Sequence, residues 1–176
     1  MKKSLFAEFL AAPVSFLKRI GFKIDEEMVG THRFDTKIVN LRLASDRPFR
    51  FDVTWGTDSI WQWLQPGDDF LVSELFGTVT ADGLGDHSPC NGTLALRYFD
   101  EHRLRYDFQF EKGCQLLRFV GEKVNIRPWN LLVSHTTCIG RITDEKGRLI
   151  STALVFFRLR DIPRFLRSFR LTFDEE

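Results

Sequence analysis

Two seven-residue segments alternate strictly between apolar and polar side chains, and this pattern constrains the fold more than any other feature of the chain. The segment FRFDVTW (residues 49–55) turns its apolar side chains to one side and its polar ones to the other, and LRYDFQF (residues 104–110) repeats the pattern. A period of two residues is typical of a β-strand with one buried and one solvated face. Such strands pair in antiparallel sheets, so we expect a mainly antiparallel β protein.

Weaker strand patterns occupy much of the remaining chain, at residues 27–34, 36–43, 70–81, 92–99, 115–125, 131–142 and 148–159. Turn residues separate several of them, for example Lys112-Gly113. A meander of about nine strands removes its exposed edges best by closing on itself. The sequence therefore predicts an all-β fold with short helices, in which the meander closes into a lipocalin-like barrel of about 8–10 strands.

Two short segments have helical periodicity instead. In GTDSIWQWLQPGDD (residues 56–69), Thr57 or Asp58 is the expected N-cap and a Pro-Gly pair the expected stop. In RDIPRFLRSF (residues 160–169), Asp161 is the expected N-cap of a helix with one apolar stripe. The stripe consists of Ile162, Phe165, Leu166 and Phe169.

The first 22 residues, MKKSLFAEFLAAPVSFLKRIGF, resemble a secretory signal, but Glu8 interrupts the apolar run and no stretch is long enough to span a membrane. An amphipathic helix broken at Pro13, with Phe9 and Phe16 on its apolar stripes, is the better interpretation. We therefore expect an N-terminal helical segment at residues 1–22 and a single β-barrel domain at residues 23–176. The default partner of the helix is its own barrel; a protein or a bilayer surface is the alternative.

Charge and cysteine usage exclude some functions. The chain has 25 Lys and Arg against 24 Asp and Glu, a net charge of +1, so it lacks the global positive charge typical of nucleic-acid binding. Both ends are basic, and Arg164 and Arg167 project from the predicted C-terminal helix. Three scattered cysteines form no CxxC pair, which fits a reducing, cytoplasmic location, with peripheral membrane contact as a further option.

No motif for catalysis or a cofactor stands out. The chain has neither a GxGxxG nor a GxxxxGK[ST] sequence, and His87 and Cys90 alone make a poor metal site. In VSHTTC (residues 133–138), strand alternation separates His135 from Cys138. We expect no cofactor, no metal and no catalytic residue, and an enzyme is the least favoured of three interpretations.

Two charged residues fall on predicted strands. Lys123, in FVGEKVN, shares a face with Phe119 and Gly121, and Glu27 precedes an apolar strand segment. A carboxylate and an ammonium group that both point into a barrel either pair with each other or are neutralised, because burying one charge alone is costly. Glu27 is therefore the candidate partner of Lys123. Together they either hold the fold or, with Tyr106, orient the polar head of a ligand.

From about residue 22 to residue 173 the chain resembles the β-rich domain attached to cholesterol-oxidase-like flavoproteins of the glucose-methanol-choline oxidoreductase group, as a stand-alone version. The segments that carry the resemblance are Glu27-Met28-x-Gly30, FGTVTADGL (76–84), GTLALRYFD (92–100), LRYDFQF, FVGEKV (119–124), Trp129 followed by Thr136-Thr137, and FRLRDIPRFLRSFRLT (157–172). The resemblance implies an accessory barrel in lipid or sterol metabolism with a flavin oxidoreductase as a possible partner. The flavin site belongs to the other domain of those proteins.

These observations support two functional hypotheses. The first is non-catalytic binding of an apolar, lipid- or sterol-like ligand inside the barrel, with Glu27, Tyr106, Lys123 and Trp129 as ligand-binding residues. The second is a filled barrel that acts as a protein- or membrane-interaction module through Phe9, Phe16, Arg164 and Arg167. A cavity lined by the aromatic residues beside Lys123 favours the first hypothesis, and a solid interior with an exposed apolar stripe favours the second.

Overall fold

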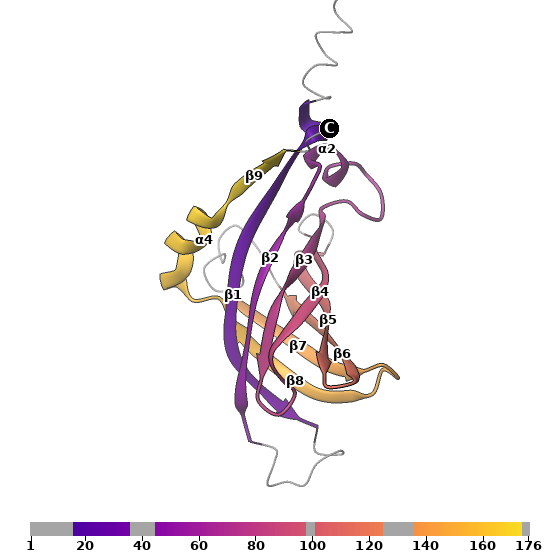
Figure 1. The fold of residues 1–176 in the computed structure, drawn as a ribbon, viewed down its shortest axis with the longest axis vertical. Coiled ribbons are helices and arrows are strands. Elements are labelled where there is room, and N and C mark those ends of the chain that lie inside the picture. Colours follow the sequence, from indigo (N-terminus) through magenta and orange to yellow (C-terminus); the bar gives the residue numbers. More distant parts are fainter. Residues whose placement is uncertain (1–15, 36–44, 98–100, 125–135, 174–176) are drawn as a thin grey trace, which may run out of the picture.

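Eight antiparallel strands close into a barrel, and a ninth strand extends one side of it (Figure 1). The computed structural model describes residues 16–35, 45–97, 101–124 and 136–173. The strands are β1 (Ile20–Phe34), β2 (Arg47–Thr57), β3 (Val72–Ala81), β4 (Gly85–Arg97), β5 (Arg103–Lys112), β6 (Gln115–Lys123), β7 (Thr137–Asp144), β8 (Leu149–Phe156) and β9 (Arg170–Phe173). Three short helices accompany them: α2 (Ile60–Trp63), η2 (Leu159–Asp161) and α4 (Ile162–Ser168).

The predicted meander is confirmed. Each strand from β1 to β7 pairs antiparallel with the next strand in sequence, and β8 pairs with β1 to close the barrel. The two alternating segments lie in β2 and β5, where Phe49, Phe51, Tyr106 and Phe108 are buried inside the barrel. Alternation thus identified both the strands and their buried faces, because one face of each strand packs on the core.

Several predicted boundaries need correction. Strand β1 begins at Ile20, so residues 20–22 belong to the barrel and not to the N-terminal helical segment. A helical turn at residues 16–19 precedes it, and the rest of the predicted N-terminal helix, including Phe9, lies outside the described residues. Helix α2 is capped by Ser59, whose Oγ accepts a hydrogen bond from the Gln62 N–H at 3.3 Å. Thr57 does not cap it, because this residue ends β2 and its hydroxyl accepts from the Ser59 N–H at 3.2 Å.

The barrel interior is packed with aromatic rings. Phe119 is fully buried, and its ring centroid lies 4.9 Å from that of Phe108, 5.3 Å from Phe49 and 5.7 Å from Phe51. Two glycines that pair across β6 and β7 make room for it, since an added Cβ at either position would lie 2.3–2.6 Å from the Phe119 ring. Rings therefore fill this part of the interior.

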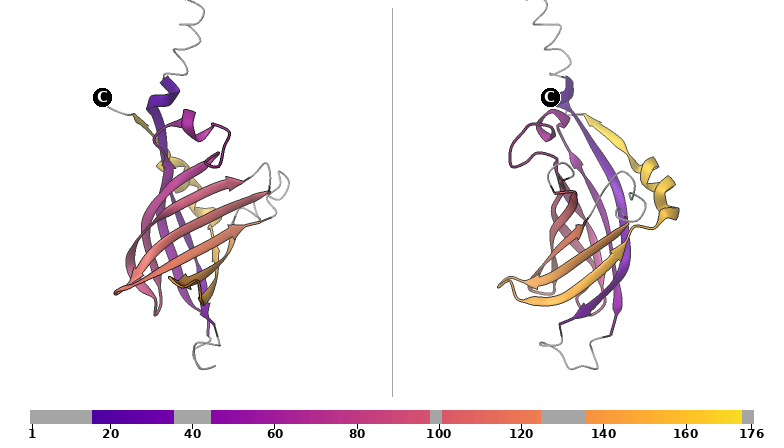
Figure 2. Two further views of the ribbon diagram at one scale, coloured as in Figure 1. Left: turned by 90° about the vertical axis from the view of Figure 1, so that its right-hand side faces the viewer. Right: turned by 180° about the vertical axis from the view of Figure 1, so that it is seen from behind.

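Strand β1 has two different neighbours on its side away from β2. Its first residues, Ile20–Lys23, pair with β9, and its last residues, Val29–Phe34, pair with β8. Between them, residues 24–28 pair with β2 and with no other strand among the described residues. Helix α4 lies against the outside of the barrel next to this interval of β1 (Figure 2). On this side of the interval the barrel wall therefore consists of β1 and the side chains of α4, and not of two paired strands.

Candidate functional site

A lysine and a glutamate form an ion pair inside the barrel. Lys123, the last residue of β6, is 3% exposed, and its Nζ donates a hydrogen bond to Glu26 Oε1 at 2.8 Å. Glu26 lies on β1 within the interval of residues 24–28, which pairs with neither β8 nor β9 on its second side. Each charge is compensated by the other, as burial of either one requires.

Two further side chains complete the site. The Tyr106 hydroxyl lies 2.9 Å from both oxygens of Glu26, to which it donates, and Trp55 Nε1 donates to Oε2 at 3.2 Å. The Glu26 carboxylate therefore accepts from three donors. Below, "polar cluster" refers to Glu26, Trp55, Tyr106 and Lys123.

The ammonium group of Lys123 is less fully satisfied than the carboxylate. It has three N–H donors, and among the described residues it makes one hydrogen bond, to Glu26. Two aromatic rings lie near it, with centroids 5.2 Å (Tyr106) and 5.9 Å (Phe157) from Nζ. Such rings attract a cation but accept no conventional hydrogen bond, so the buried ammonium group retains donor capacity.

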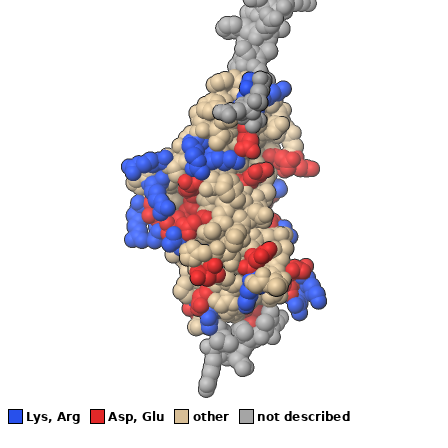
Figure 3. Space-filling view, in the orientation of Figure 1, with Lys and Arg blue, Asp and Glu red and all other residues tan. Residues whose placement is uncertain are grey.

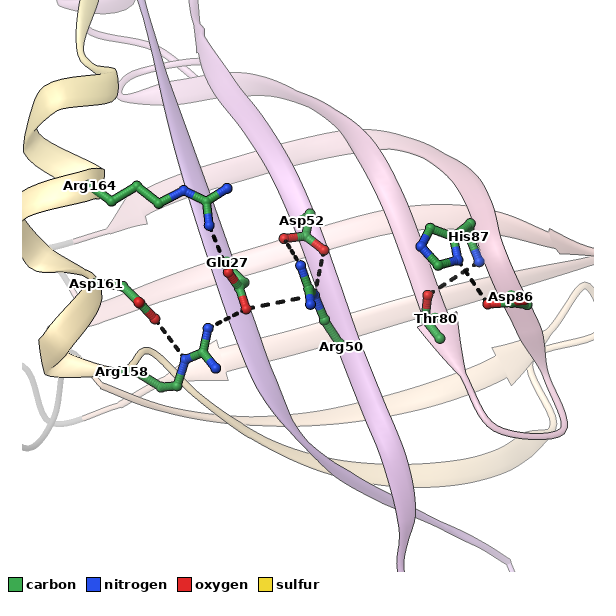
Figure 4. A network of polar contacts seen from close by, with 9 residues as sticks. All are labelled: Glu27, Arg50, Asp52, Thr80, Asp86, His87, Arg158, Asp161 and Arg164. Atoms are coloured by element: carbon green, nitrogen blue, oxygen red, sulfur yellow. Dashed lines mark hydrogen bonds and ion pairs between the residues drawn. The ribbon is translucent and has the colours of Figure 1, made fainter.

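The predicted partner of Lys123 was wrong by one residue. Successive residues of a strand point to opposite faces, so Glu26 points into the barrel and Glu27 points out of it. Glu27 is bound on the outside by Arg158, by Arg164 at 3.2 Å and by Arg50 at 3.7 Å (Figure 4). Glu27 is therefore not a residue of the barrel interior. Trp129, the remaining predicted ligand-binding residue, lies outside the described residues.

Glu27 belongs to a network of ion pairs that connects α4 and its flanking residues to the barrel wall. Arg50 also pairs with Asp52 on β2, at 2.7 and 2.9 Å. Arg158 also pairs with Asp161 at 2.7 Å, and a separate pair, Arg170–Asp25 at 3.0 Å, lies beside them. Asp161 is the N-cap residue of α4, as predicted, but its carboxylate binds Arg158 and makes no side-chain capping hydrogen bond. We call these residues, with Arg164, the outer ion-pair network.

A cleft of about 230 Å³ lies between the outer ion-pair network and the β1–β2 wall. Glu26 contributes to its lining from β1, and Phe157, Phe165 and Arg164 line it from the C-terminal part of the chain. Three other clefts, of about 500 to 690 Å³, are lined by residues of α2 and the turns or by the β3–β5 wall. Neither Lys123 nor the rings of Phe49, Phe51 and Phe119 line any of these four clefts.

The other chemical groups singled out in the sequence do not assemble into a site. His87 is an exposed side chain that binds Asp86 at 2.9 Å, whereas Cys90 is buried, so the two do not form a metal site (Figure 4). No group of three metal-ligating side chains occurs among the described residues. Burial raises the pKa of Cys138 to about 12, although the nearby Lys123 ammonium lowers it, so this thiol stays protonated and unreactive. Ser134 and His135 lie outside the described residues.

A second feature of interest is an exposed apolar edge near the C-terminus. Leu166 on α4 is 64% exposed and Phe173 on β9 is 61% exposed, although the predicted apolar stripe of this helix would be expected to pack on the barrel. Phe16, next to β9 through the Ile20–Phe173 pairing, is 60% exposed. Phe169 and Leu171 are also about half exposed. Lys and Arg side chains gather on the same side of the molecule as α4 (Figure 3).

Comparisons with known proteins gave no match. No known protein family, curated protein or solved structure matches this chain. The resemblance to the accessory domain of cholesterol-oxidase-like flavoproteins therefore stays a prediction. Among the described residues, no helix has the length and apolar character needed to cross a bilayer.

Sequence reasoning missed three residues of the site: Glu26, Trp55 and Phe157. The sequence did indicate that Glu26 points inward, because it lies two residues from both Ile24 and Met28 and therefore on the same face of the strand as these buried residues. Trp55 was recognised as an inward apolar residue, but its role as a donor to a carboxylate depends on pairing with β1. No local pattern marks Phe157, which follows β8 and owes its position to α4.

At the other end of β1, a buried histidine predicts a pH dependence of stability. His32 Nε2 donates to the Asp82 carbonyl at 3.1 Å, and Nδ1 lies 2.8 Å from Ser151 Oγ. Burial lowers the pKa of His32 below its usual 6.5, and the Arg47 charge adds to this, although the hydrogen bond to Asp82 opposes it. The unfolded chain then binds more protons than the folded one below pH 6.5, so stability falls as the pH decreases through this range.

We expect the urea midpoint to be lower at pH 5.5 than at pH 7.5, and expect the difference to shrink in His32→Gln. A matched control is His87→Gln, because His87 is exposed and should leave the difference unchanged. An identical pH dependence of wild type and His32→Gln would contradict this assignment.

Proposed function

We propose that this protein is a peripheral module that docks onto an anionic lipid surface through the side of the barrel that carries α4 and β9. The docking face consists of Phe16, Lys18, Arg160, Leu166, Arg167, Phe169, Leu171 and Phe173. The observation that carries the proposal is the exposure of large apolar side chains among arginines in one short segment. Monomeric proteins seldom expose such a combination without a binding function.

The exposed apolar side chains of the docking face favour contact with a bilayer. Leu166 and Phe173 are both more than half exposed, and Phe16 lies next to the β1–β9 end of the molecule. Each would gain about 1.5–3 kcal/mol by full burial in an apolar environment. A bilayer interface offers such an environment to apolar groups that protrude from a rigid scaffold.

The positive charges of the docking face favour an anionic lipid surface. Arg160 and Arg167 are exposed and, among the described residues, have no ion-pair partner, unlike Arg158, Arg164 and Arg170. Unpaired cations beside apolar groups favour an anionic lipid surface, where each contributes about 1 kcal/mol. Arg164, predicted from the sequence as a surface-binding residue, is instead engaged with Glu27, although its side chain is still largely exposed.

Vesicle flotation tests the proposal. We expect the full chain to float with vesicles of phosphatidylcholine and phosphatidylserine, to float poorly with phosphatidylcholine alone, and to be released by salt, because salt screens exposed charges. The variant Arg160→Gln/Arg167→Gln should reduce partitioning to the anionic vesicles by about tenfold or more. Leu166→Ser/Phe173→Ser should reduce it to a similar extent.

The matched control is Arg141→Gln/Lys112→Gln, which removes two exposed cations outside the docking face and should leave flotation unchanged. Equal flotation of this control and the docking-face variants would contradict the proposal, as would an absence of flotation of the wild type. In the latter case the same face would be a candidate site for a protein partner, such as the flavin oxidoreductase that the sequence resemblance suggests.

Binding of a lipid- or sterol-like ligand in the barrel is the second candidate. The observation in its favour is the donor capacity of the buried Lys123 ammonium group. The close packing of the phenylalanine rings means that a ligand would have to bind at the polar cluster and not among those rings. Extraction of the purified protein followed by mass spectrometry would detect such a ligand.

A further inference from the structure

We propose that the wall beside Glu26 is a closed lateral entrance to the barrel, and that the polar cluster behind it binds an uncharged apolar molecule through a carbonyl or hydroxyl oxygen. The entrance is covered by Phe157 and α4, which we call the cover. This inference does not depend on lipid docking, because it rests on the interior ion pair and the strand pairing of β1.

The strand pairing of the wall changes beside Glu26. Residues 24–28 of β1 pair with β2 on one side and with neither β8 nor β9 on the other. Elsewhere adjacent strands pair around the barrel, with one register shift between β3 and β4 and one between β7 and β8. Opening the wall at this interval would therefore break no strand ladder, whereas opening it elsewhere would break several backbone hydrogen bonds at once.

Phe157 lies between the interior of the barrel and α4. Its ring centroid is 5.9 Å from Lys123 Nζ and 5.4 Å from the ring of Phe165 on α4, in an edge-to-face arrangement. Phe157 is partly buried and packs against the core. Movement of this one ring together with α4 would therefore expose the ammonium group to the cleft of about 230 Å³ outside.

Polar contacts with β1 hold α4 and its flanking residues in place. Glu27, itself buried, is bound by Arg158 and by the largely exposed Arg164, and Asp25 is bound by the half-exposed Arg170. The Asp25 N–H also donates a hydrogen bond to Ser168 Oγ at 2.9 Å. Exposed ion pairs contribute little to stability and are screened by salt. Segments with few buried contacts open at lower free energy than the core, so α4 should separate before any barrel strand does.

The charges and hydrogen bonds of the polar cluster define the chemical class of the ligand. Glu26 and Lys123 neutralise each other, so a charged head group would be buried without a counter-ion of its own. The Glu26 carboxylate already accepts from three donors, whereas the Lys123 ammonium group has one acceptor in the part of the chain that the structure describes. A carbonyl or hydroxyl oxygen supplies the missing acceptor without adding charge.

Binding of the fluorescent probe prodan, a neutral naphthyl ketone, tests the ligand class. We expect saturable binding to the wild type, about tenfold tighter than that of dimethylaminonaphthalene, which lacks the carbonyl, because a hydrogen bond from a charged donor supplies the difference. The variant Glu26→Gln/Lys123→Met removes both charges together and keeps an acceptor for Tyr106 and Trp55. It should bind the two probes with nearly equal affinity while remaining folded, as circular dichroism would verify.

Association kinetics test the entrance. We expect Phe157→Ala and Glu27→Gln each to increase the association rate of prodan several-fold, because they remove the covering ring and a contact that holds α4. The control is Asp107→Asn, which removes a carboxylate bound by Arg118 at 2.7 Å on a different part of the wall and should leave the rate unchanged.

Three results would overturn the proposal: no saturable prodan binding to the wild type, equal affinity for both probes, or unchanged association rates in both entrance variants. Loss of vesicle flotation in the docking-face variants without any change in prodan binding would separate this inference from the proposed lipid docking.

Discussion

Lys123→Met on its own should lower the free energy of unfolding by about 3–5 kcal/mol, since it leaves the Glu26 carboxylate buried without a compensating charge. Tyr106 and Trp55 would still donate to this carboxylate, but neither carries a positive charge. Urea unfolding monitored by tryptophan fluorescence measures the loss.

The informative comparison is with Glu26→Gln/Lys123→Met. Removing both charges should restore most of the lost stability, because a neutral pair of similar volume carries a much smaller desolvation penalty. Lys112→Met, at an exposed lysine, should change stability by less than about 0.5 kcal/mol. If the double variant were as unstable as Lys123→Met, the pairing of the two charges would not be the cause of the loss.

Phe119→Ala should lower the free energy of unfolding by about 3–5 kcal/mol, because it removes a fully buried ring that contacts three other phenylalanines. Phe76→Ala is the matched control: Phe76 lies on the outer face of β3 and is about half exposed, so its truncation should have a much smaller effect. Chemical denaturation of the two variants measures the difference.

A second substitution identifies the cause. In the wild type, Gly140→Ala would place a Cβ 2.3 Å from Phe119 Cε2, so it should destabilise the protein by about 1–3 kcal/mol through overpacking. In the Phe119→Ala background that clash is absent, and Gly140→Ala should become nearly neutral. Additive effects of the two substitutions would contradict the proposed packing of the ring between Gly121 and Gly140.

The sequence was most informative where local pattern and tertiary structure coincide. The alternation in residues 49–55 and 104–110 correctly predicted two strands and their buried faces, because burial of one strand face imposes a period of two residues. The C-terminal helix was also correctly predicted, within two residues of its start and one of its end, from Pro163 and the helical spacing around it. Barrel closure followed from the number of strands and the need to protect edges.

Features that depend on pairing between distant segments could not be predicted from the sequence. Glu27 was predicted as the partner of Lys123 because the strand was expected to begin at residue 27, whereas β1 begins at Ile20. The alternation of inward and outward side chains along β1 could therefore not be used to choose between Glu26 and Glu27. The outer network brings Glu27 together with Arg158 and Arg164, which lie 131 and 137 residues further along the chain. No local signal specifies such contacts, since they arise when the last segment returns to the first strand.

The closure of the barrel between β1 and β8 has a consequence for how the chain is made. His32 and Ser151, which meet at this junction, are 119 residues apart, so during synthesis β1 emerges long before β8 is available. Pairings of such high sequence separation form late and slowly. Until then β1 has β2 as its strand neighbour and one unpaired edge, and the aromatic interior has no complete wall. We expect the growing chain to be most vulnerable to aggregation in this period, which ends when β8 is released from the ribosome.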